Sequence, residues 1–307
     1  MQSQRIIFIV GPTAVGKSEV AFRLAPMINA EIISADSMQI YREIMIASNK
    51  PPSDYLRKIP HHLIGIVSAE ESFDVAKYHK FAWEVMARIQ KEGKIPLVVG
   101  GSGLYVSILI DGIFAQEVHN EEIRHALKKA AQAEGNASLY ARLKQLDPQA
   151  AAKIHPHDER RTIRALEVVE LTRQPISELQ KKREGLWGKF AIQMIGLNRE
   201  RPELYERIDH RVDAMFQEGL VEEVRQLNKM NLSQTAVKSI GIREILGLIA
   251  GDYDLERARY LVKRNTRRYA KRQLTWFRKD KRISWTMLHK NDRAQNVALR
   301  MKEMLTL

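Results

Sequence analysis

The sequence predicts an α/β fold, in which a parallel β-sheet is flanked by helices and interrupted by an all-helical subdomain. Three observations support this prediction. Short apolar runs alternate with helical patterns as far as about residue 112. The first apolar run leads directly into a glycine-rich loop and the start of a helix. Between residues 116 and 189, strand signals become rare while helical spacing of apolar residues continues.

The alternating segment contains three expected strands. They span residues 5–10, 30–34 and 95–99, and helices are expected at residues 19–25 and 72–92. β-Branched and aromatic side chains fill the first strand, as is typical of strands buried on both faces. Parallel strands bring their carboxyl ends to one edge of the sheet, where such folds bind ligands. Ser34, Asp36 and Ser102 end or follow strands and are therefore expected at that edge.

The composition changes in the middle of the chain and changes back near residue 190. Residues 116–189 are rich in Ala, Glu, Lys, Gln and Arg, with helical spacing throughout. A strand-like run at residues 190–197, followed by a helix pattern, indicates that the α/β core resumes. We therefore expect a core domain of residues 1–115 and 190–307 with basic C-terminal helices, and a helical insertion domain of residues 116–189.

The bulk composition narrows the class of protein. Apolar residues make up 44% of the 307 residues, and no run approaches the roughly 18 to 20 apolar residues that span a bilayer. The chain has no cysteine, which excludes disulfides and thiolate catalysis and is typical of a reducing compartment. We expect a cytoplasmic monomer that does not engage a membrane. The formal net charge of +13 favours a polyanionic partner, of which nucleic acid is the commonest.

The glycine-rich loop matches a phosphate-binding motif. The stretch IIFIVGPTAVGKS fits the template G-x-x-x-x-G-K-[ST], known as the P-loop. In this motif backbone N–H groups and a helix N-terminus surround an anion, while the hydroxyl reaches Mg²⁺. Because strand, loop and helix occur in the required order, we favour a P-loop NTPase-like core over a glycine-rich turn with a solvated lysine. The expected anion cradle comprises Gly11, Pro12, Thr13, Ala14, Val15, Gly16, Lys17 and Ser18, with Ser18 as the Mg²⁺ ligand.

The acid that nucleotide-hydrolysing P-loop proteins use is missing from the expected strand. Residues 95–99 run into Gly100-Gly101-Ser102-Gly103 without a carboxylate, whereas P-loop ATPases place an acid there to hold magnesium. Asp36, which follows another strand, has three candidate roles: magnesium ligand, turn or helix cap, and general base. A base opposite a phosphate cradle suits proton removal from a nucleophile, so the loop could hold a leaving diphosphate.

A strongly basic helical segment occupies part of the C-terminal third. Between Arg257 and Arg282 there are twelve Lys or Arg residues and one acid, Asp280. A helical stripe of one sign repels itself unless a polyanion lies across it, which favours nucleic-acid binding over a merely solvated face. The residues expected on this stripe include Arg264, Arg267, Arg268 and Lys271.

Several longer motifs follow the P-loop in a fixed order. They read ADSMQIY, HHLIG, VVGGSGLY, DERRTIRALEV and AKRQLTWFRK. Together with GPTAVGKS, these motifs resemble the bacterial tRNA dimethylallyltransferases, also called isopentenylpyrophosphate:tRNA transferases. The resemblance covers nearly the whole chain, and ADSMQ after a P-loop is more specific than the P-loop alone.

The resemblance implies a reaction. A dimethylallyl group passes from dimethylallyl diphosphate to N6 of the adenosine 3′ of the anticodon, position 37, in tRNAs that read codons beginning with U. The products are N6-dimethylallyladenosine and diphosphate. Asp36 is then the general base, and Lys17 assists catalysis. Ser102 and Arg211 join the P-loop in binding the diphosphate, with Mg²⁺ as cofactor.

The same resemblance names residues expected to contact the tRNA anticodon stem-loop. A glutamine amide can read an adenine edge with two hydrogen bonds, which suits Gln39. Arg161 and Arg164 match an R-x-x-R contact on one helix face. The expected set is Asp36, Ser37, Met38, Gln39, Ser102, Arg124, Arg160, Arg161, Arg164, Arg264, Arg268, Lys271, Arg272 and Gln273.

Three positions depart from the family pattern. Val15 stands where relatives commonly have serine, Ser102 replaces threonine in GGTGLY, and Ile242 replaces tyrosine in IGYKE. The animal and yeast relatives also carry a zinc-finger tail, which a chain without cysteine lacks.

Other interpretations stay open on the residues alone. Spacing favours Arg211 as a surface helix residue paired with Asp213 or Glu218. The histidines at 61–62 and 155–157 have no acidic partner at ligand spacing and favour structural roles over metal binding. A P-loop small-molecule or nucleoside kinase would use the loop but not the basic helix. A non-catalytic RNA-binding module would leave the intact loop unexplained.

Overall fold

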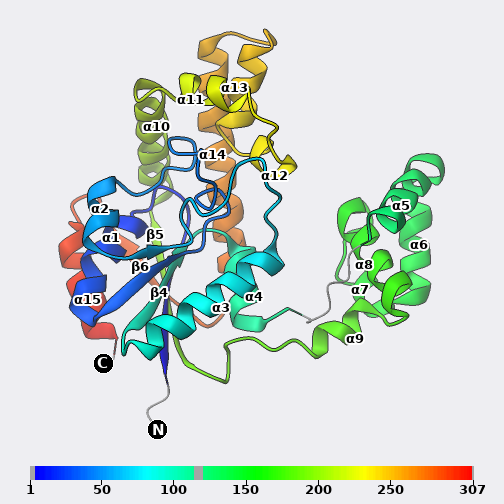
Figure 1. Cartoon of the computed structure of the whole chain (residues 1–307), viewed down its shortest axis with the longest axis horizontal. Coiled ribbons are helices and arrows are strands. Elements are labelled where there is room, and N and C mark those ends of the chain that lie inside the picture. The colour runs from blue at the N-terminus through cyan, green and yellow to red at the C-terminus, as the bar shows by residue number, and fades with distance from the viewer. Residues whose placement is uncertain (1–3, 114–119, 306–307) are drawn as a thin grey trace. The chain divides into compact units, whose positions relative to one another are not determined.

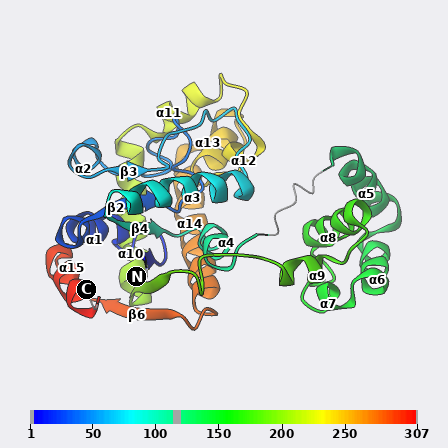
Figure 2. The ribbon, with the colours of Figure 1, turned by 60° about the horizontal axis from the view of Figure 1, so that its bottom comes forward.

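The computed structural model describes residues 4–113 and 120–305 and divides into two compact units. One unit comprises residues 1–110 and 186–307, and the other comprises residues 111–185 (Figures 1 and 2). The second boundary therefore lies between residues 185 and 186. The composition had suggested a boundary a few residues later, between 189 and 190. The first expected boundary, between 115 and 116, lies outside the described residues.

Within the described residues, the larger unit contains a six-stranded sheet in the order β3-β2-β4-β1-β5-β6. All of its strand pairs are parallel, and Ile7 of β1 lies opposite Leu97 of β4 and Gln193 of β5. The carboxyl ends of the strands therefore meet at one edge. The strands are β1 (Arg5–Val10), β2 (Ala30–Ser34), β3 (His61–His62), β4 (Ile95–Gly100), β5 (Ala191–Arg199) and β6 (Ile283–Leu288).

The central strand is buried on both faces. Residues 6–10 of β1 are all inaccessible to solvent, and successive side chains point to opposite faces of the sheet. Ile7 and Ile9 belong to the same core cluster as Val20 and Leu24 of α1. Such uniformly apolar strands are typical of parallel sheets, so the α/β class predicted from the sequence is confirmed.

Helices cover the sheet and extend beyond its carboxyl edge. α1 packs against α15, α3 packs against β4, and α10 packs against α14 (Figure 1). Asp74 begins α3 by accepting hydrogen bonds from the Ala76 and Lys77 amides. The helices are α1 (Lys17–Leu24), the 3-10 helix η1 (Ala25–Ile28), α2 (Ser53–Lys58), α3 (Val75–Lys91), α4 (Gly103–Asp111), α10 (Arg201–Gln217), α11 (Leu220–Leu227), α12 (Gln234–Val237), α13 (Ile242–Ile249), α14 (Leu255–Phe277) and α15 (Ala294–Met304).

The smaller unit is built from helices around a core of its own. Leu127, Leu139, Leu143 and Leu166 are buried in that core. Its helices are α5 (Glu121–Glu134), α6 (Asn136–Leu146), α7 (Pro148–Ala151), α8 (Glu159–Thr172) and α9 (Ile176–Lys181). Asn120, Asp147 and Asp158 begin α5, α7 and α8, and each accepts a backbone N–H with its side chain.

The strands β3 and β6 were not expected from the sequence. β6 lies at the edge of the sheet, and its Trp285 and Met287 remain exposed, so its apolar pattern is not that of a buried strand. β3 consists of two residues only. Among the described residues, no helix combines the length and apolar character needed to cross a membrane.

Candidate active site

The P-loop follows β1 and turns into the N-terminus of α1. Gly11 has a φ of +146°, and a Cβ there would lie 2.4 Å from the Leu197 carbonyl oxygen, so glycine lets the loop pass close to β5. Gly16 precedes α1 with a φ of +111°, and Ala14 has a φ of +63°. Positive φ at a residue other than glycine is strained, and such strain clusters at functional sites. The free N–H groups of the first turn of α1 complete an anion cradle.

Lys17 is held by the loop that precedes it. Its Nζ donates to the carbonyl oxygens of Gly11 at 3.0 Å and Pro12 at 2.8 Å. An ammonium group has three N–H donors, so one remains for a ligand. Burial lowers the pKa of Lys17 to about 8, against an opposing effect of Asp36 and with a further lowering by Arg211.

A cavity of about 230 Å³ opens at the carboxyl ends of β1, β2 and β4. It brings together groups that lie far apart in the sequence, because three parallel strands end there. Its lining includes Thr13, Lys17, Ser18, Asp36, Gln39 and Arg211. The expected cradle, base and diphosphate-binding arginine thus share one cavity.

Asp36 enters this cavity from the end of β2. Its Oδ1 accepts a hydrogen bond from the Met38 amide at 2.9 Å, so the side chain caps a local turn. None of the described residues donates a hydrogen bond to Oδ2. The turn role and the base role are therefore compatible, because one carboxylate oxygen orients the group while the other is left to accept a proton.

The helical spacing suggested that Arg211 lies on the surface, but the structure shows that it does not. Its Nη1 donates to Thr13 Oγ1 in the P-loop at 2.6 Å, and burial lowers its pKa to about 10. Its Nε is buried and has no hydrogen-bond partner among the described residues. Asp213, the partner expected from spacing, instead lies 2.7 Å from Lys263 Nζ. Arg211 is therefore a cradle residue with a donor to spare.

The residues expected to read the target base lie beside Asp36. Gln39 Oε1 accepts from Ser34 Oγ at 2.9 Å, and its Nε2 donates to the Asn49 carbonyl at 3.1 Å. A bidentate contact to adenine would have to replace these bonds. Ser37 and Met38 are half-buried in the same turn.

Ser102, expected at the same site, is not among the residues that line the cavity. Its backbone N–H donates to the Ala35 carbonyl at 3.1 Å, just before α4 begins. This bond ties the loop after β4 to the loop after β2.

Gln273 ties the basic helix α14 to the P-loop. It is 5% exposed, its Oε1 accepts from the Thr13 amide at 2.8 Å, and its Nε2 donates to the Gly101 carbonyl at 2.9 Å. A Cβ on Gly101 would lie 2.2 Å from this Nε2, so the glycine admits the bond. The resemblance placed Gln273 among the RNA contacts, but both ends of its amide are bonded within the protein.

Seven of the eight basic residues of α14, all except Arg257, form two rows. The paired row, formed by Arg259, Lys263 and Arg267, faces two acids of α10: Lys263 lies 2.7 Å from Asp213, and Arg267 lies 3.5 Å from Asp209. The stripe predicted from the sequence wrongly included Arg267. The open row consists of Arg264, Arg268, Lys271 and Arg272, all exposed except the half-buried Arg264. None of these four residues has an acidic partner among the described residues.

In the smaller unit, two expected arginines meet on one carboxylate. Glu167 of α8 is completely buried and accepts from Arg124 Nη2 at 3.0 Å and Arg164 Nη1 at 2.9 Å. Arg160 and Arg161 are exposed on the same helix. Arg124 and Arg164 are therefore held in fixed positions, whereas no described carboxylate clamps Arg160 or Arg161 in this way.

Two arginines beside the P-loop were not among the expected site residues. Arg199 Nε donates to the Val15 carbonyl at 3.0 Å, and Arg207 Nε donates to the Ala14 carbonyl at 2.9 Å. Arg199 ends β5, so its position at the carboxyl edge was the signal that could have found it. Nothing in the spacing of α10 marks Arg207.

The departures from the family pattern and the histidines have structural explanations. The Val15 side chain is completely buried in the core, as is Ile242 at the start of α13. His61 Nδ1 lies 2.7 Å from the Ile59 carbonyl oxygen, and His62 Nε2 lies 2.7 Å from Glu31. Within the described ranges, no group of three His, Cys, Asp or Glu residues could hold a metal.

The oxygen groups near the P-loop suit a magnesium ion that keeps several waters. Ser18 and Asp36 both line the cavity, and there is no cage of protein ligands in the described part of the chain. Mg²⁺ is commonly held by one or two protein oxygens together with substrate phosphates.

Comparisons with known proteins identify the family of the chain. An IPP transferase family model matches residues 39–280. The tRNA dimethylallyltransferase of Alkaliphilus oremlandii is 46% identical over 298 residues, which cover 96% of this chain and 95% of that relative. The tRNA dimethylallyltransferase of Geobacter sulfurreducens is 44% identical over 283 residues, which cover 92% and 91%.

Solved structures give the same result. The full-length tRNA isopentenylpyrophosphate transferase of Bacillus halodurans is 37% identical, with a TM-score of 0.71 over 98% of this chain and 96% of that one. A eukaryotic dimethylallyltransferase acting on tRNA is 28% identical, with a TM-score of 0.81 over 99% of this chain and 80% of that one. With a family model covering most of its length and relatives this similar, the chain belongs to the IPP transferase family.

Proposed function

We propose that the chain is a tRNA dimethylallyltransferase that modifies N6 of adenosine 37 in tRNAs reading codons that begin with U. One observation carries the proposal: Asp36 shares a cavity with Lys17 and Arg211. A carboxylate next to an anion cradle suits alkyl transfer from a diphosphate to a nucleophile that must lose a proton. The two bacterial relatives described above are tRNA dimethylallyltransferases, which supports this substrate class.

The reaction follows from the groups in the cavity. The N6 atom of adenine forms a bond to C1 of the dimethylallyl group while the bond from C1 to the diphosphate oxygen breaks. The exocyclic amine is a weak nucleophile, because its lone pair is delocalised into the ring. Asp36 Oδ2 accepts the N6 proton as the new bond forms, which prevents a full positive charge on nitrogen.

The leaving diphosphate gains negative charge as its bond to carbon breaks. Lys17 and the N–H groups of the P-loop contact its oxygens, and Arg211 adds a guanidinium whose Nε has no other partner among the described residues. Ser18 would hold a Mg²⁺ ion together with the diphosphate, and the ion would neutralise further charge on the leaving group. These contacts strengthen in the transition state, so they accelerate the reaction.

Positively charged side chains attract the tRNA. The open row of α14 attracts the phosphates of the anticodon stem-loop, and the arginines of the smaller unit add contacts of the same kind. Adenosine 37 leaves its stack to reach Asp36, at a cost of a few kcal/mol that stacking and hydrogen bonds offset. Ser37, Met38 and Gln39 then contact the extruded base.

Labelled dimethylallyl diphosphate and labelled ATP, each incubated with the chain and unmodified tRNA, test this proposal. We expect label from the prenyl donor in the tRNA and no phosphoryl transfer from ATP. Asp36→Asn keeps the acceptor for the Met38 amide but removes the base, so turnover should fall by about 10² to 10⁴ while tRNA affinity persists.

Asp74→Asn is the matched control, because Asp74 also accepts backbone amides and lies outside the cavity. It should leave turnover unchanged. Near-normal turnover in Asp36→Asn would refute the base assignment, and transfer of phosphate from ATP to a hydroxyl acceptor would favour a kinase.

A further inference from the structure

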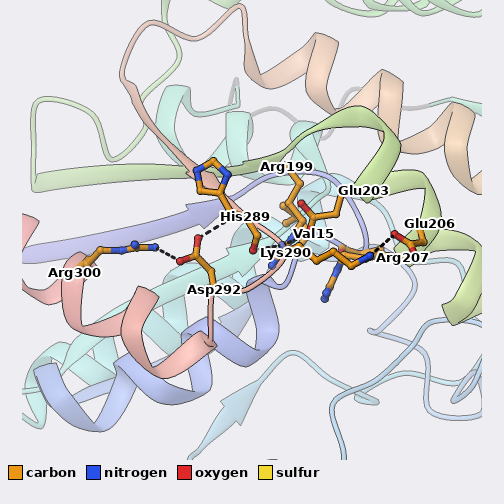
Figure 3. Close-up of polar contacts among 10 residues, drawn as sticks. Val15, Arg199, Glu203, Glu206, Arg207, His289, Lys290, Asp292 and Arg300 are labelled. Carbon is orange, nitrogen blue, oxygen red and sulfur yellow. Dashed lines mark hydrogen bonds and ion pairs between the residues drawn. The ribbon is translucent and has the colours of Figure 1, made fainter.

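A second cavity, of about 330 Å³, flanks the P-loop at the carboxyl ends of β5 and β6. Its walls come from α1, from the ends of β5 and β6, from α10, from the segment between β6 and α15, and from the first turn of α15. Figure 3 shows three of the lining residues, Arg199, Arg207 and Asp292. It shares Gly16, Glu19 and Arg207 with the cavity of Asp36, but it contains neither Asp36 nor Lys17. The proposed reaction makes no use of it.

We call this second cavity the rear cavity. Most of the charged residues that line it are positive. It holds the four arginines Arg23, Arg199, Arg207 and Arg293, against two acids, Glu19 and Asp292. Asp292 is already satisfied, since it accepts from the His289 amide at 2.9 Å and from Arg300 Nη2 at 3.0 Å (Figure 3). Arg23, Arg207 and Arg293 therefore have no ion-pair partner among the described residues, whereas Arg199 is paired with Glu203 of α10.

Arg199 is a buried residue of the rear cavity whose side chain is held in place by hydrogen bonds. It is 6% exposed, its Nε donates to the Val15 carbonyl, and its Nη1 donates to the His289 carbonyl at 2.9 Å and to Glu203. Its Nη2 has no hydrogen-bond partner among the described residues. A guanidinium fixed by its other two nitrogens therefore presents the two N–H donors of Nη2 without a partner.

Arg207 adds a second guanidinium beside the first. Its Nε holds the Ala14 carbonyl, and no described residue bonds to its terminal nitrogens. Burial and then the charge of Arg199 lower the pKa of Arg207, opposed by Glu203 and Glu19. Two nearby guanidiniums repel each other, and an anion between them would relieve that repulsion.

The remaining walls suit a molecule with a negative end and an apolar part. The N-terminus of α15 opens into the cavity through Ala294 and Gln295, and no side chain caps it. The buried side chains of Val20, Leu288 and Val297 provide apolar surface. We propose that the rear cavity binds a small phosphate-bearing molecule at a site separate from the P-loop.

Because of its position, a ligand bound at this site can affect the proposed reaction. The guanidiniums that meet the phosphate group also hold the carbonyls of Ala14 and Val15, on the P-loop itself. Occupancy of the rear cavity therefore acts on residues that fix the shape of the diphosphate cradle.

Binding of inorganic phosphate to the full chain, measured by calorimetry, tests the inference. The P-loop also attracts phosphate, so the experiment uses Lys17→Ala, which removes the point charge of the cradle. In that background we expect one saturable phosphate site per chain. Adding Arg23→Ala and Arg293→Ala should weaken it by about tenfold or more, because two charge-assisted hydrogen bonds to the anion are removed.

The matched control is Arg57→Ala with Arg225→Ala, which removes the same charge from exposed surface pairs outside both cavities. It should change phosphate affinity by less than about twofold. If Lys17→Ala alone abolishes saturable binding, or if the cavity pair behaves like the control pair, the inference is wrong. Melting temperatures without phosphate verify folding, and Arg23→Ala alone replaces the pair if the pair does not fold.

Discussion

Lys17 and Arg211 hold their charges in a partly desolvated cavity, and this governs how the cavity binds an anion. Burial lowers the pKa of Lys17 to about 8 and that of Arg211 to about 10. Each lowered value means that the protein disfavours the cationic form of that group relative to water. A diphosphate supplies the missing counter-charge, so binding and protonation reinforce each other.

The affinity for diphosphate should therefore fall as the pH rises through about 8. Below this pH Lys17 is already charged, whereas above it binding must also take up a proton, at about 1.4 kcal/mol per pH unit. Calorimetry in two buffers of different ionisation enthalpy should show larger proton uptake at about pH 9 than at about pH 7. Lys17→Met should abolish that difference. Equal proton uptake at both pH values in the unchanged chain would contradict the assignment.

Arg211→Lys tests the role of the fixed guanidinium. Lysine keeps the charge but cannot bond Thr13 and the ligand in the same fork geometry. We expect kcat/KM for dimethylallyl diphosphate to fall by about 10- to 100-fold with little change in tRNA affinity. The exposed Arg201 of the same helix provides the control, Arg201→Lys, which should resemble the unchanged chain. A loss of tRNA affinity alone would place Arg211 on the RNA path instead.

Among the elements, those with local signals were predictable from the sequence, and those fixed by distant contacts were not. β1 and the P-loop follow from an apolar run and a glycine pattern. The place of Arg211 depends on Thr13, 198 positions earlier, so no spacing within α10 could reveal it. Arg267 was assigned to the wrong row of α14, because only the packing of α10 shows which side carries the acids. β6 was missed because half of its side chains face solvent.

The link between α14 and the P-loop can be tested at Gln273. Gln273→Met keeps a similar volume but leaves the Thr13 amide and the Gly101 carbonyl without their partner, at about 1 to 3 kcal/mol each. If Gln273 positions the P-loop, KM for dimethylallyl diphosphate should rise while tRNA affinity stays nearly constant. Lys271→Met, two positions earlier and exposed, should show the opposite pattern. A fall in tRNA affinity alone for Gln273→Met would instead support direct RNA contact.

For the whole molecule, the distribution of charge matters more than the net value of +13. Two acids of α10 already neutralise most of the charge of the paired row of α14, whereas the open row has no such partners among the described residues. Only uncompensated cations release counterions when they meet phosphates, so they set the salt dependence of RNA binding. Glu167 shows a further use of compensation, because it fixes two arginines of the smaller unit in place.

Two triple variants with the same change in net charge separate these contributions. Arg264→Gln, Arg268→Gln and Lys271→Gln remove the open row, whereas Arg259→Gln, Lys263→Gln and Arg267→Gln remove the paired row. The tRNA affinity of the unchanged chain should fall steeply with salt, and the open-row variant should lower the log-log slope by about one for each phosphate that α14 no longer neutralises. The paired-row variant should change that slope much less, because removal of its three cations also leaves two acids of α10 without their partners. Filter binding across a range of salt concentrations measures both slopes, and equal slopes would mean that net charge, rather than the open row, governs RNA binding.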